Sequence, residues 1–148
     1  MSNAVEIPFE TTLLVRDTCL CLHVQRAARA LARRFDEALR PFGLTNGQFS
    51  LMMSLNRPVP ASMGSVTALL AIDQTTLTAA LKPLERRGWV SIVPNPKDRR
   101  ARLLSLTPAG KAALAAAVPI WKTTHAALEE RLPDGNGDRL RSDLAILL

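Results

Sequence analysis

Two short β-rich runs, residues 89–93 and 102–106, interrupt a sequence that otherwise carries helical periodicity. The segment between them holds Pro94, Pro96 and a cluster of charged side chains. Prolines restrict the backbone, so the pair of runs predicts a β-hairpin with a stiff, projecting loop that is longer than the tightest turns. With one hairpin and several helices, the chain is predicted to be mainly α with a small β-hairpin wing.

Helical periodicity and capping residues divide the rest of the chain. Apolar residues recur at three- and four-residue steps over residues 12–39, which predicts one long helix that ends at Pro41 and Gly43. Further helices are predicted at residues 45–57, 63–70, 74–88, 108–132 and 139–148. Four of them begin at residues whose side chains cap helices: Thr45 (with Gln48 completing a capping box), Ser62, Asp73 and Thr107. In the first of these four, the predicted inward face is Phe49, Met52, Met53 and Leu55.

This order of elements is typical of a winged helix-turn-helix with long N- and C-terminal dimerisation helices. We expect residues 1–44 to form an N-terminal arm and dimerisation helix, and residues 45–107 to form the winged helix-turn-helix DNA-binding domain. Residues 108–148 are expected to supply the C-terminal dimerisation helices, with everything in one compact domain. An apolar stripe as long as the first, on a chain of 148 residues, often packs against another subunit.

Net charge and aromatic content narrow the class of partner. A formal charge of +6 favours a polyanion, which is either nucleic acid or an anionic membrane surface. Tyrosine is absent and aromatic residues make up 4% of the chain, so the stacking platforms that bind single strands are not expected. No apolar run reaches the ~18 residues of a membrane-spanning helix, and no signal peptide opens the chain. Duplex DNA and a cytoplasmic location are therefore expected, without a membrane partner.

The helix predicted at residues 74–88 has two faces. On a helical wheel, Leu81 and Leu84 each lie within ~40° of Leu77, and the three define the buried side. Small hydroxyl groups on the opposite side suit base edges or phosphates, and cations suit the DNA backbone. The predicted DNA contacts of this helix are Thr75, Thr78, Lys82 and Arg86. A solvated face without a ligand is the alternative.

Four consecutive charged residues lie at the predicted wing tip: Lys97, Asp98, Arg99 and Arg100. An arginine at the end of a wing can enter the minor groove, where the negative potential is focused. A carboxylate there repels DNA unless it is paired, so we expect Asp98 to hold an arginine guanidinium through a bidentate bond. All four residues are candidate DNA contacts, and a loop that is merely kept soluble by its charges is the alternative.

These motifs resemble the MarR (multiple antibiotic resistance regulator) family of bacterial transcription factors, over about residues 19–132. The matching features are the segment 42–52 after a long first helix, Leu84-Glu85, Gly88, the Asp98-x-Arg100 pair, and Leu106-Thr107-Pro108-x-Gly110.

The resemblance implies an obligate homodimer with interleaved terminal helices, recognition helices in successive major grooves, and Arg100 in the minor groove oriented by Asp98. Two-fold symmetry then predicts an inverted-repeat operator with half-sites roughly 10 bp apart. Members of the family usually repress, and a small anionic or phenolic ligand or thiol oxidation releases them. We expect a ligand-released repressor, with the effector in a cleft between the helical arms and the winged domain.

Cys19, Cys21 and His23 raise the questions of a metal site and a redox sensor. Residues two apart point ~200° away from each other on a helix, so the two cysteines cannot bind one ion from the same face, and no metal is expected. Cys21 lies 24 residues before Thr45, the offset of the reactive cysteine in the organic-hydroperoxide-sensing branch of the MarR family. Oxidation sensing by Cys21 is therefore the alternative function. The chain lacks the tyrosines with which that branch bonds the thiolate, so a buried structural cysteine is favoured.

No pattern in the sequence suggests catalysis. The sequence suggests no pair of nucleophile and base, has no glycine-rich phosphate-binding loop, and contains no set of histidines that could bind a metal. We therefore expect neither an enzyme nor a cofactor. A winged helix used for protein–protein contact is a further alternative, and salt-dependent binding to random duplex DNA separates it from a DNA-binding regulator.

Overall fold

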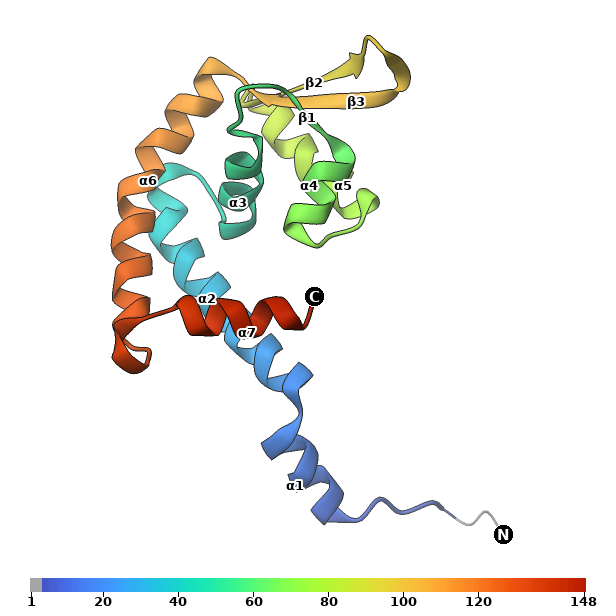
Figure 1. Ribbon diagram of the computed structural model, residues 1–148, viewed down its shortest axis with the longest axis vertical. Helices are drawn as coiled ribbons and strands as arrows, with labels where there is room; N and C mark the ends of the chain where they lie inside the picture. The colour runs from blue at the N-terminus through green and yellow to red at the C-terminus, as the bar shows by residue number, and fades with distance from the viewer. Residues whose placement is uncertain (1–3) are drawn as a thin grey trace. The chain divides into compact units, whose positions relative to one another are not determined.

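The computed structural model describes residues 4–148 and has the predicted mainly α architecture with a β-hairpin wing (Figure 1). The chain forms two compact units, divided between Arg34 and Phe35. In chain order the elements are α1 (Phe9–Thr18), α2 (Leu20–Leu39), the short 3-10 helix η1 (Arg40–Phe42), α3 (Asn46–Leu55), β1 (Ala61–Ser62), α4 (Met63–Leu70), α5 (Gln74–Arg86), β2 (Val90–Asn95), β3 (Asp98–Leu106), α6 (Pro108–Glu129), the 3-10 helix η2 (Pro133–Gly135) and α7 (Asp138–Ile146).

The first helix differs from the prediction of one continuous element. It starts earlier, at Phe9, and is interrupted at Cys19, whose backbone is extended (φ −66°, ψ 109°). The Thr18 hydroxyl donates to the Leu14 carbonyl at 2.7 Å, a side-chain bond that competes with helix continuation. Cys19 also starts α2, because its carbonyl accepts from the His23 backbone N–H at 3.1 Å. In the sequence, the only sign of this break is a Thr18 hydroxyl followed by Cys19, a residue with a low helix propensity, and this signal is too weak to predict it.

The core of the second unit is built by α3, α4, α5, α6 and the sheet. The predicted inner face of α5 is confirmed, since Leu77, Leu81 and Leu84 are all buried. Each such side chain contributes about 1.5–3 kcal/mol on burial. On α3 the prediction is wrong at one position: Met53 is 42% exposed, and Leu51 is buried instead.

The sheet has the strand order β1-β3-β2, and both strand pairs are antiparallel. The predicted long loop is wrong, because β2 and β3 continue until Asn95 pairs with Asp98 and leave only Pro96 and Lys97 between them. The Asn95 side chain accepts from the Lys97 backbone N–H at 3.0 Å, which closes a tight turn. Pro94 is tolerated because β2 is an edge strand, and a register shift separates it from Asn95.

The predicted helix caps are confirmed. Thr45 and Gln48 make both bonds of the capping box. The other three side chains each accept from a backbone N–H in the first turn of their helix: Ser62 from Ser65, Asp73 from Thr76 and Thr107 from Gly110. These local bonds place the start of every helix around the sheet.

Helix α6 continues through Pro119 to Glu129, and its middle packs on the core through aromatic side chains. The Trp121 ring stacks near Phe35 and Phe49, with centroids 6.5 and 6.0 Å away, and on His125 at 4.8 Å. His125 is therefore a packing residue. None of the helices in residues 4–148 combines the length and apolarity needed to span a bilayer.

Candidate nucleic-acid interface

The outward side of α5 carries the four residues predicted to contact DNA. Thr75, Thr78, Lys82 and Arg86 are all exposed, opposite the buried leucines of the same helix. The Thr78 hydroxyl donates to the Gln74 carbonyl at 2.9 Å, which leaves its oxygen free to accept from a ligand. The Asp73 cap fixes the start of the helix, so the two threonines lie in its first turns.

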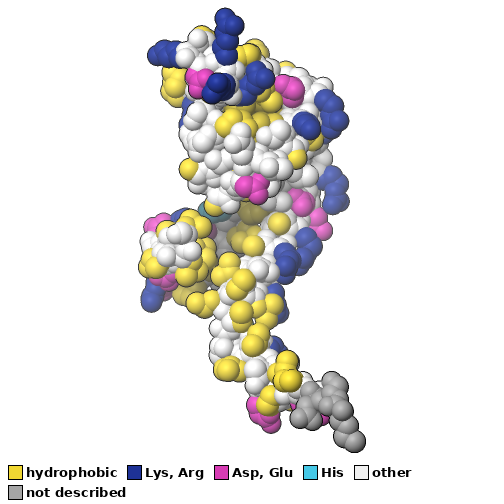
Figure 2. Space-filling model, turned by 90° about the vertical axis from the view of Figure 1, so that its right-hand side faces the viewer, with side chains coloured by type: hydrophobic (Ala, Val, Ile, Leu, Met, Phe, Trp, Pro, Cys, Tyr) yellow, Lys and Arg dark blue, Asp and Glu magenta, His cyan; other side chains and the backbone are white. Residues whose placement is uncertain are grey.

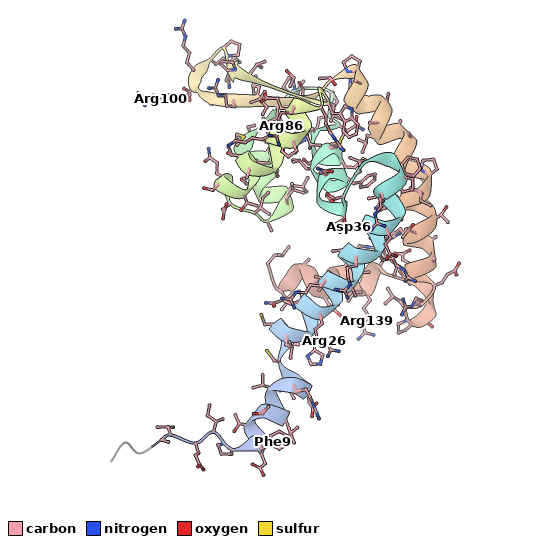
Figure 3. All side chains as sticks on the ribbon, turned by 180° about the vertical axis from the view of Figure 1, so that it is seen from behind. Phe9, Arg26, Asp36, Arg86, Arg100 and Arg139 are labelled. Atoms are coloured by element: carbon pink, nitrogen blue, oxygen red, sulfur yellow. The ribbon has the colours of Figure 1, made fainter. Side chains whose placement is uncertain are left out.

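The hairpin presents the second group of predicted residues. Lys97 lies in the turn, and Asp98, Arg99 and Arg100 are the first residues of β3; all four are exposed. Figure 2 shows Lys and Arg side chains gathered around this end of the second unit, and Figure 3 shows Arg100 near the far end of the hairpin.

Sequence reasoning missed Arg102. It is exposed on β3, two residues beyond Arg100, and pairs in register with Pro94. The register shift places Arg99, Arg100 and Ala101 in a bulge of β3 between Asp98, which pairs with Asn95, and Arg102. In the sequence, Arg102 falls within the apolar run of residues 102–106, which masks it as a candidate contact.

The bond expected of Asp98 differs in the structure. Its carboxylate accepts from the backbone N–H of Arg100 at 3.1 Å, so it braces the strand rather than the guanidinium. Within residues 4–148 the ion pairs involve only Arg16 and Arg141 among the cations. The arginines of the hairpin and the cations of α5 are therefore not neutralised by carboxylates of the described chain.

A network of backbone contacts joins the end of α5 to the hairpin and to α6. Gly88 adopts a left-handed backbone (φ 74°), which turns the chain from helix into strand. The Thr107 hydroxyl donates to the Gly88 carbonyl at 2.6 Å, and the Thr107 N–H donates to the Trp89 carbonyl at 3.0 Å. Gly110 lies directly against Trp89. The exposed face of α5 and the cationic hairpin thus belong to one braced assembly, with Arg86 at the end of α5 next to the hairpin (Figure 3).

The cysteine cluster contradicts the expectation of a buried structural thiol. Cys21 is exposed and Cys19 is half-buried, because α2 buries no side chain before Leu39 within the described chain. The Gln25 amide donates to the Cys21 sulfur at 3.1 Å, and the His23 ring nitrogen Nδ1 lies 2.8 Å from the Cys19 carbonyl oxygen. Across residues 4–148, no three His, Cys, Asp or Glu side chains come together in a way that would hold a metal ion.

The Asp73 cap makes a pH-dependent prediction. The hydrogen bond from the Thr76 backbone N–H holds the pKa of Asp73 below its usual value. A lowered pKa in the folded state means that this stabilisation is present above the unfolded pKa, near 4, and is lost as the pH falls through the folded pKa. We expect Asp73→Ala to lower the urea midpoint at pH 7 and to lower it less at pH 2.5.

Asp73→Asn is the matched control, because asparagine caps helices as well as aspartate but does not titrate. The urea midpoint of Asp73→Asn at pH 7 should be close to that of the unmodified chain. Its midpoint should also fall less between pH 7 and pH 2.5 than the midpoint of the unmodified chain. Equal losses for Asp73→Ala at both pH values would argue against an ionised cap.

Comparisons with known proteins place this geometry in context. The sequence model described as the MarR family matches residues 44–101. The transcriptional activatory protein BadR of Rhodopseudomonas palustris is 32% identical over 95 residues, which cover 62% of this chain and 54% of that protein. The transcriptional regulator MosR of M. tuberculosis, solved in complex with DNA, is 37% identical with a TM-score of 0.80, covering 88% of this chain and 93% of the other.

A mutant of MarR from E. coli, solved in complex with operator DNA, has a TM-score of 0.80 at 26% identity and covers 92% of this chain and 98% of the other. The match to the curated relatives is shorter. Alignments with the first three cover 54%, 61% and 56% of those proteins, so the chain spans little more than half of their length.

Proposed function

The chain belongs to the MarR family, and we propose on that basis that it is a homodimeric, sequence-specific regulator of transcription that binds double-stranded DNA. The observation that carries the proposal is the pairing of two exposed, unneutralised cationic elements, α5 and the hairpin, on one braced unit. The MosR and MarR structures, both in complex with DNA, support it.

The two elements suit different parts of a duplex. On α5, Thr75 and Thr78 would meet base edges or phosphates in the major groove, and Lys82 and Arg86 would bind the backbone. On the hairpin, Arg100 would enter the minor groove, while Lys97 and Arg99 would bind phosphates on either side. Asp98 would act by bracing Arg100.

The dimer is proposed from apolar surface that nothing in the described chain covers. Large apolar side chains are exposed along residues 4–34, which suits burial against a second copy: Val5, Ile7, Phe9, Leu14, Val15, Leu20, Val24 and Leu31 (Figure 2). Helix α7 likewise buries no side chain and exposes Leu140, Leu144 and Ile146. Exposed apolar surface of this extent is typical of an oligomer interface. Two-fold symmetry would then favour an inverted repeat with half-sites roughly 10 bp apart.

We further propose that the regulator represses transcription and that a small anionic or phenolic ligand releases it from DNA. Oxidation of Cys21 is the second candidate, and the exposure of its thiol is the observation that favours it. The described donor to that sulfur is the neutral Gln25 amide, and the chain has no tyrosine to stabilise a thiolate.

For this reason Cys21→Ser is expected to leave the response of DNA binding to an organic hydroperoxide unchanged. The measurement is fluorescence polarisation of labelled operator DNA before and after treatment, with Cys19→Ser as the control. A response that the unmodified chain shows and Cys21→Ser loses would make the thiol the sensor.

Selection from a random duplex pool, followed by polarisation measurements at 50 and 200 mM salt, tests the proposed function. We expect an inverted repeat to be enriched, and binding even to random duplex to weaken steeply with salt, because phosphate contacts release counterions. Light scattering should give twice the chain mass. Absence of binding to any duplex at low salt would refute the proposal.

A further inference from the structure

Residues 40–45 form the turn that joins the end of α2 to the start of α3. The backbone changes direction at Gly43, which adopts a left-handed conformation (φ 71°), and the Leu44 side chain is buried in the core. Two side chains from outside the turn hold it in place, one from α2 and one from the end of α5. Neither belongs to the residues that are proposed to contact DNA.

Asp36, in the last turns of α2, holds the start of α3 (Figure 3). One oxygen of its carboxylate accepts from both the backbone N–H and the side-chain amide of Asn46, at 2.7 and 2.8 Å. The first N–H groups of a helix have no partner within the helix and lie at the positive end of its dipole, so a carboxylate is favoured there. The bond from the Asn46 backbone, and next the one from its side chain, hold the pKa of Asp36 below its usual value. Asp36 is therefore ionised at neutral pH and fixes α3 to the end of α2.

Arg87 holds the same turn from the end of α5. It is the C-cap residue of that helix, and its guanidinium donates through Nη1 to the Gly43 carbonyl. The guanidinium also lies over the Trp89 ring, with Cζ 4.5 Å from the ring centroid, in a cation–π contact. A Cβ atom on Gly43 would lie 3.5 Å from Nη2 of Arg87 and 3.8 Å from Cη2 of Trp89. The turn, the guanidinium and the ring are thus packed together.

The bond between Arg87 and Gly43 links segments that are 44 residues apart in the sequence. Within residues 4–148, the other hydrogen bonds of residues 73–88 stay inside that segment or lead to Trp89 and Thr107. Arg87 therefore supplies the direct hydrogen bond from α5 to the α2–α3 turn. Its planar guanidinium can donate to a carbonyl while it stacks on a ring, which a lysine ammonium cannot do in the same way.

We propose that Asp36 and Arg87 are positioning residues that restrict the half-site spacing which the dimer accepts on DNA. The inference rests on the proposed function, in which two copies of α5 and the hairpin bind the two half-sites of an inverted repeat. In each copy, residues 40–45 join these DNA-contacting elements to the N-terminal dimerisation helix. One base pair added between the half-sites rotates one of them by about 35° around the duplex and moves it about 3.4 Å along it. A turn that is held by both side chains resists the reorientation that such a change demands.

The two side chains act through preorganisation and not through contact with DNA. When the turn is loosened, correctly spaced half-sites are bound more weakly, because the DNA-contacting elements must be ordered on binding. Wrongly spaced half-sites lose less, since reorientation then costs less. Binding to random duplex depends on phosphate contacts and should change little. A direct phosphate contact by Arg87 would instead weaken binding to all duplexes alike and lower its salt dependence.

Polarisation titrations test the proposal on the selected operator and on versions with one base pair inserted or removed between the half-sites. We expect the unmodified chain to prefer the selected spacing by about tenfold or more. Arg87→Ala and Asp36→Ala should each lower this preference at least threefold and bind random duplex within twofold of the unmodified chain. Arg87→Lys should behave like Arg87→Ala, because it keeps the charge but loses the planar contact.

Arg40→Ala is the matched control. Arg40 is an exposed cation of the same turn, and its side chain makes no hydrogen bond or ion pair within residues 4–148. The substitution removes the same charge as Arg87→Ala and should change the spacing preference less than twofold. In Asp36→Ala the capping box of Thr45 and Gln48 still holds the start of α3, so this variant should fold, as thermal melting checks.

Hydrogen exchange of the free chain follows the same contacts without DNA. The backbone N–H groups of Gly43 and Asn46 donate to the Arg40 carbonyl and to the Asp36 carboxylate. Peptides that cover residues 40–46 should exchange about threefold faster or more in Arg87→Ala than in the unmodified chain or in Arg40→Ala.

An unchanged spacing preference in Arg87→Ala and Asp36→Ala would overturn the positioning role, and so would a full recovery of the preference in Arg87→Lys. Equal losses on the operator and on random duplex would make Arg87 a phosphate contact instead. Unchanged exchange of residues 40–46 would show that Arg87 does not hold the turn. Failure of the unmodified chain to bind any duplex would refute the proposed function and the spacing role with it, whereas faster exchange would still support the hold of Arg87 on the turn.

Discussion

Gly110→Ala is expected to destabilise the protein by about 3 kcal/mol or more, the largest loss that we predict for any one substitution. A Cβ atom at this position would overlap the Trp89 carbonyl oxygen and lie 2.9 Å from its carbonyl carbon. Both are backbone atoms, so no side-chain rotation relieves the clash. Helix α6 would have to move away from β2, and the Thr107 bonds to Gly88 and Trp89 would be strained or lost.

Urea unfolding followed by circular dichroism measures this loss, and Gly64→Ala is the matched control. Gly64 lies within α4, with no atom within 4 Å of the position that its Cβ would take. Alanine is the better helix former, so this control should gain about 0.5–1 kcal/mol. A Gly110→Ala chain as stable as the unmodified one would mean that α6 does not approach Trp89 as closely as described.

Sequence reasoning succeeded where the structural cause is local. The caps at Thr45, Asp73 and Thr107 each depend on a side chain and a backbone N–H three residues away, so the pattern contains the whole interaction. The inner face of α5 followed from helical periodicity for the same reason. These features were enough to predict the winged helix-turn-helix fold, which the structure confirms.

Features that depend on distant partners were missed. Gly43 and Arg87 are separated by 44 residues, and nothing in the pattern of either segment indicates their bond. The hairpin is longer than predicted because Pro94 and Pro96 indicate a loop, whereas an edge strand tolerates Pro94. The exposure of Cys21 could not be predicted either. An apolar stripe on a helix does not indicate whether it packs against the rest of its own chain or against a second chain.

Arg100→Ala is expected to weaken operator binding by about 1–3 kcal/mol, a 5- to 150-fold rise in the dissociation constant. Arg100 is exposed near the tip of the hairpin, between Asp98 and Arg102 along the strand. A minor-groove contact depends on the width of the groove, so the loss should be larger on the selected operator than on random duplex. Polarisation titrations on both duplexes measure the two losses, and Lys111→Ala, which removes an exposed cation of α6, is the control.

Asp98→Ala separates bracing from simple electrostatics. Removal of a negative charge next to phosphates should by itself tighten DNA binding, and this effect should be strongest at low salt. The Asp98 carboxylate, however, accepts from the Arg100 backbone N–H at 3.1 Å and fixes the strand at the residue that would enter the groove. If bracing outweighs repulsion, Asp98→Ala binds the operator more weakly than the unmodified chain, and Asp98→Asn, which keeps an acceptor oxygen, lies between the two. Tighter binding by Asp98→Ala at every salt concentration would show that the carboxylate only repels DNA, and Arg100 would then have to be oriented by the groove itself.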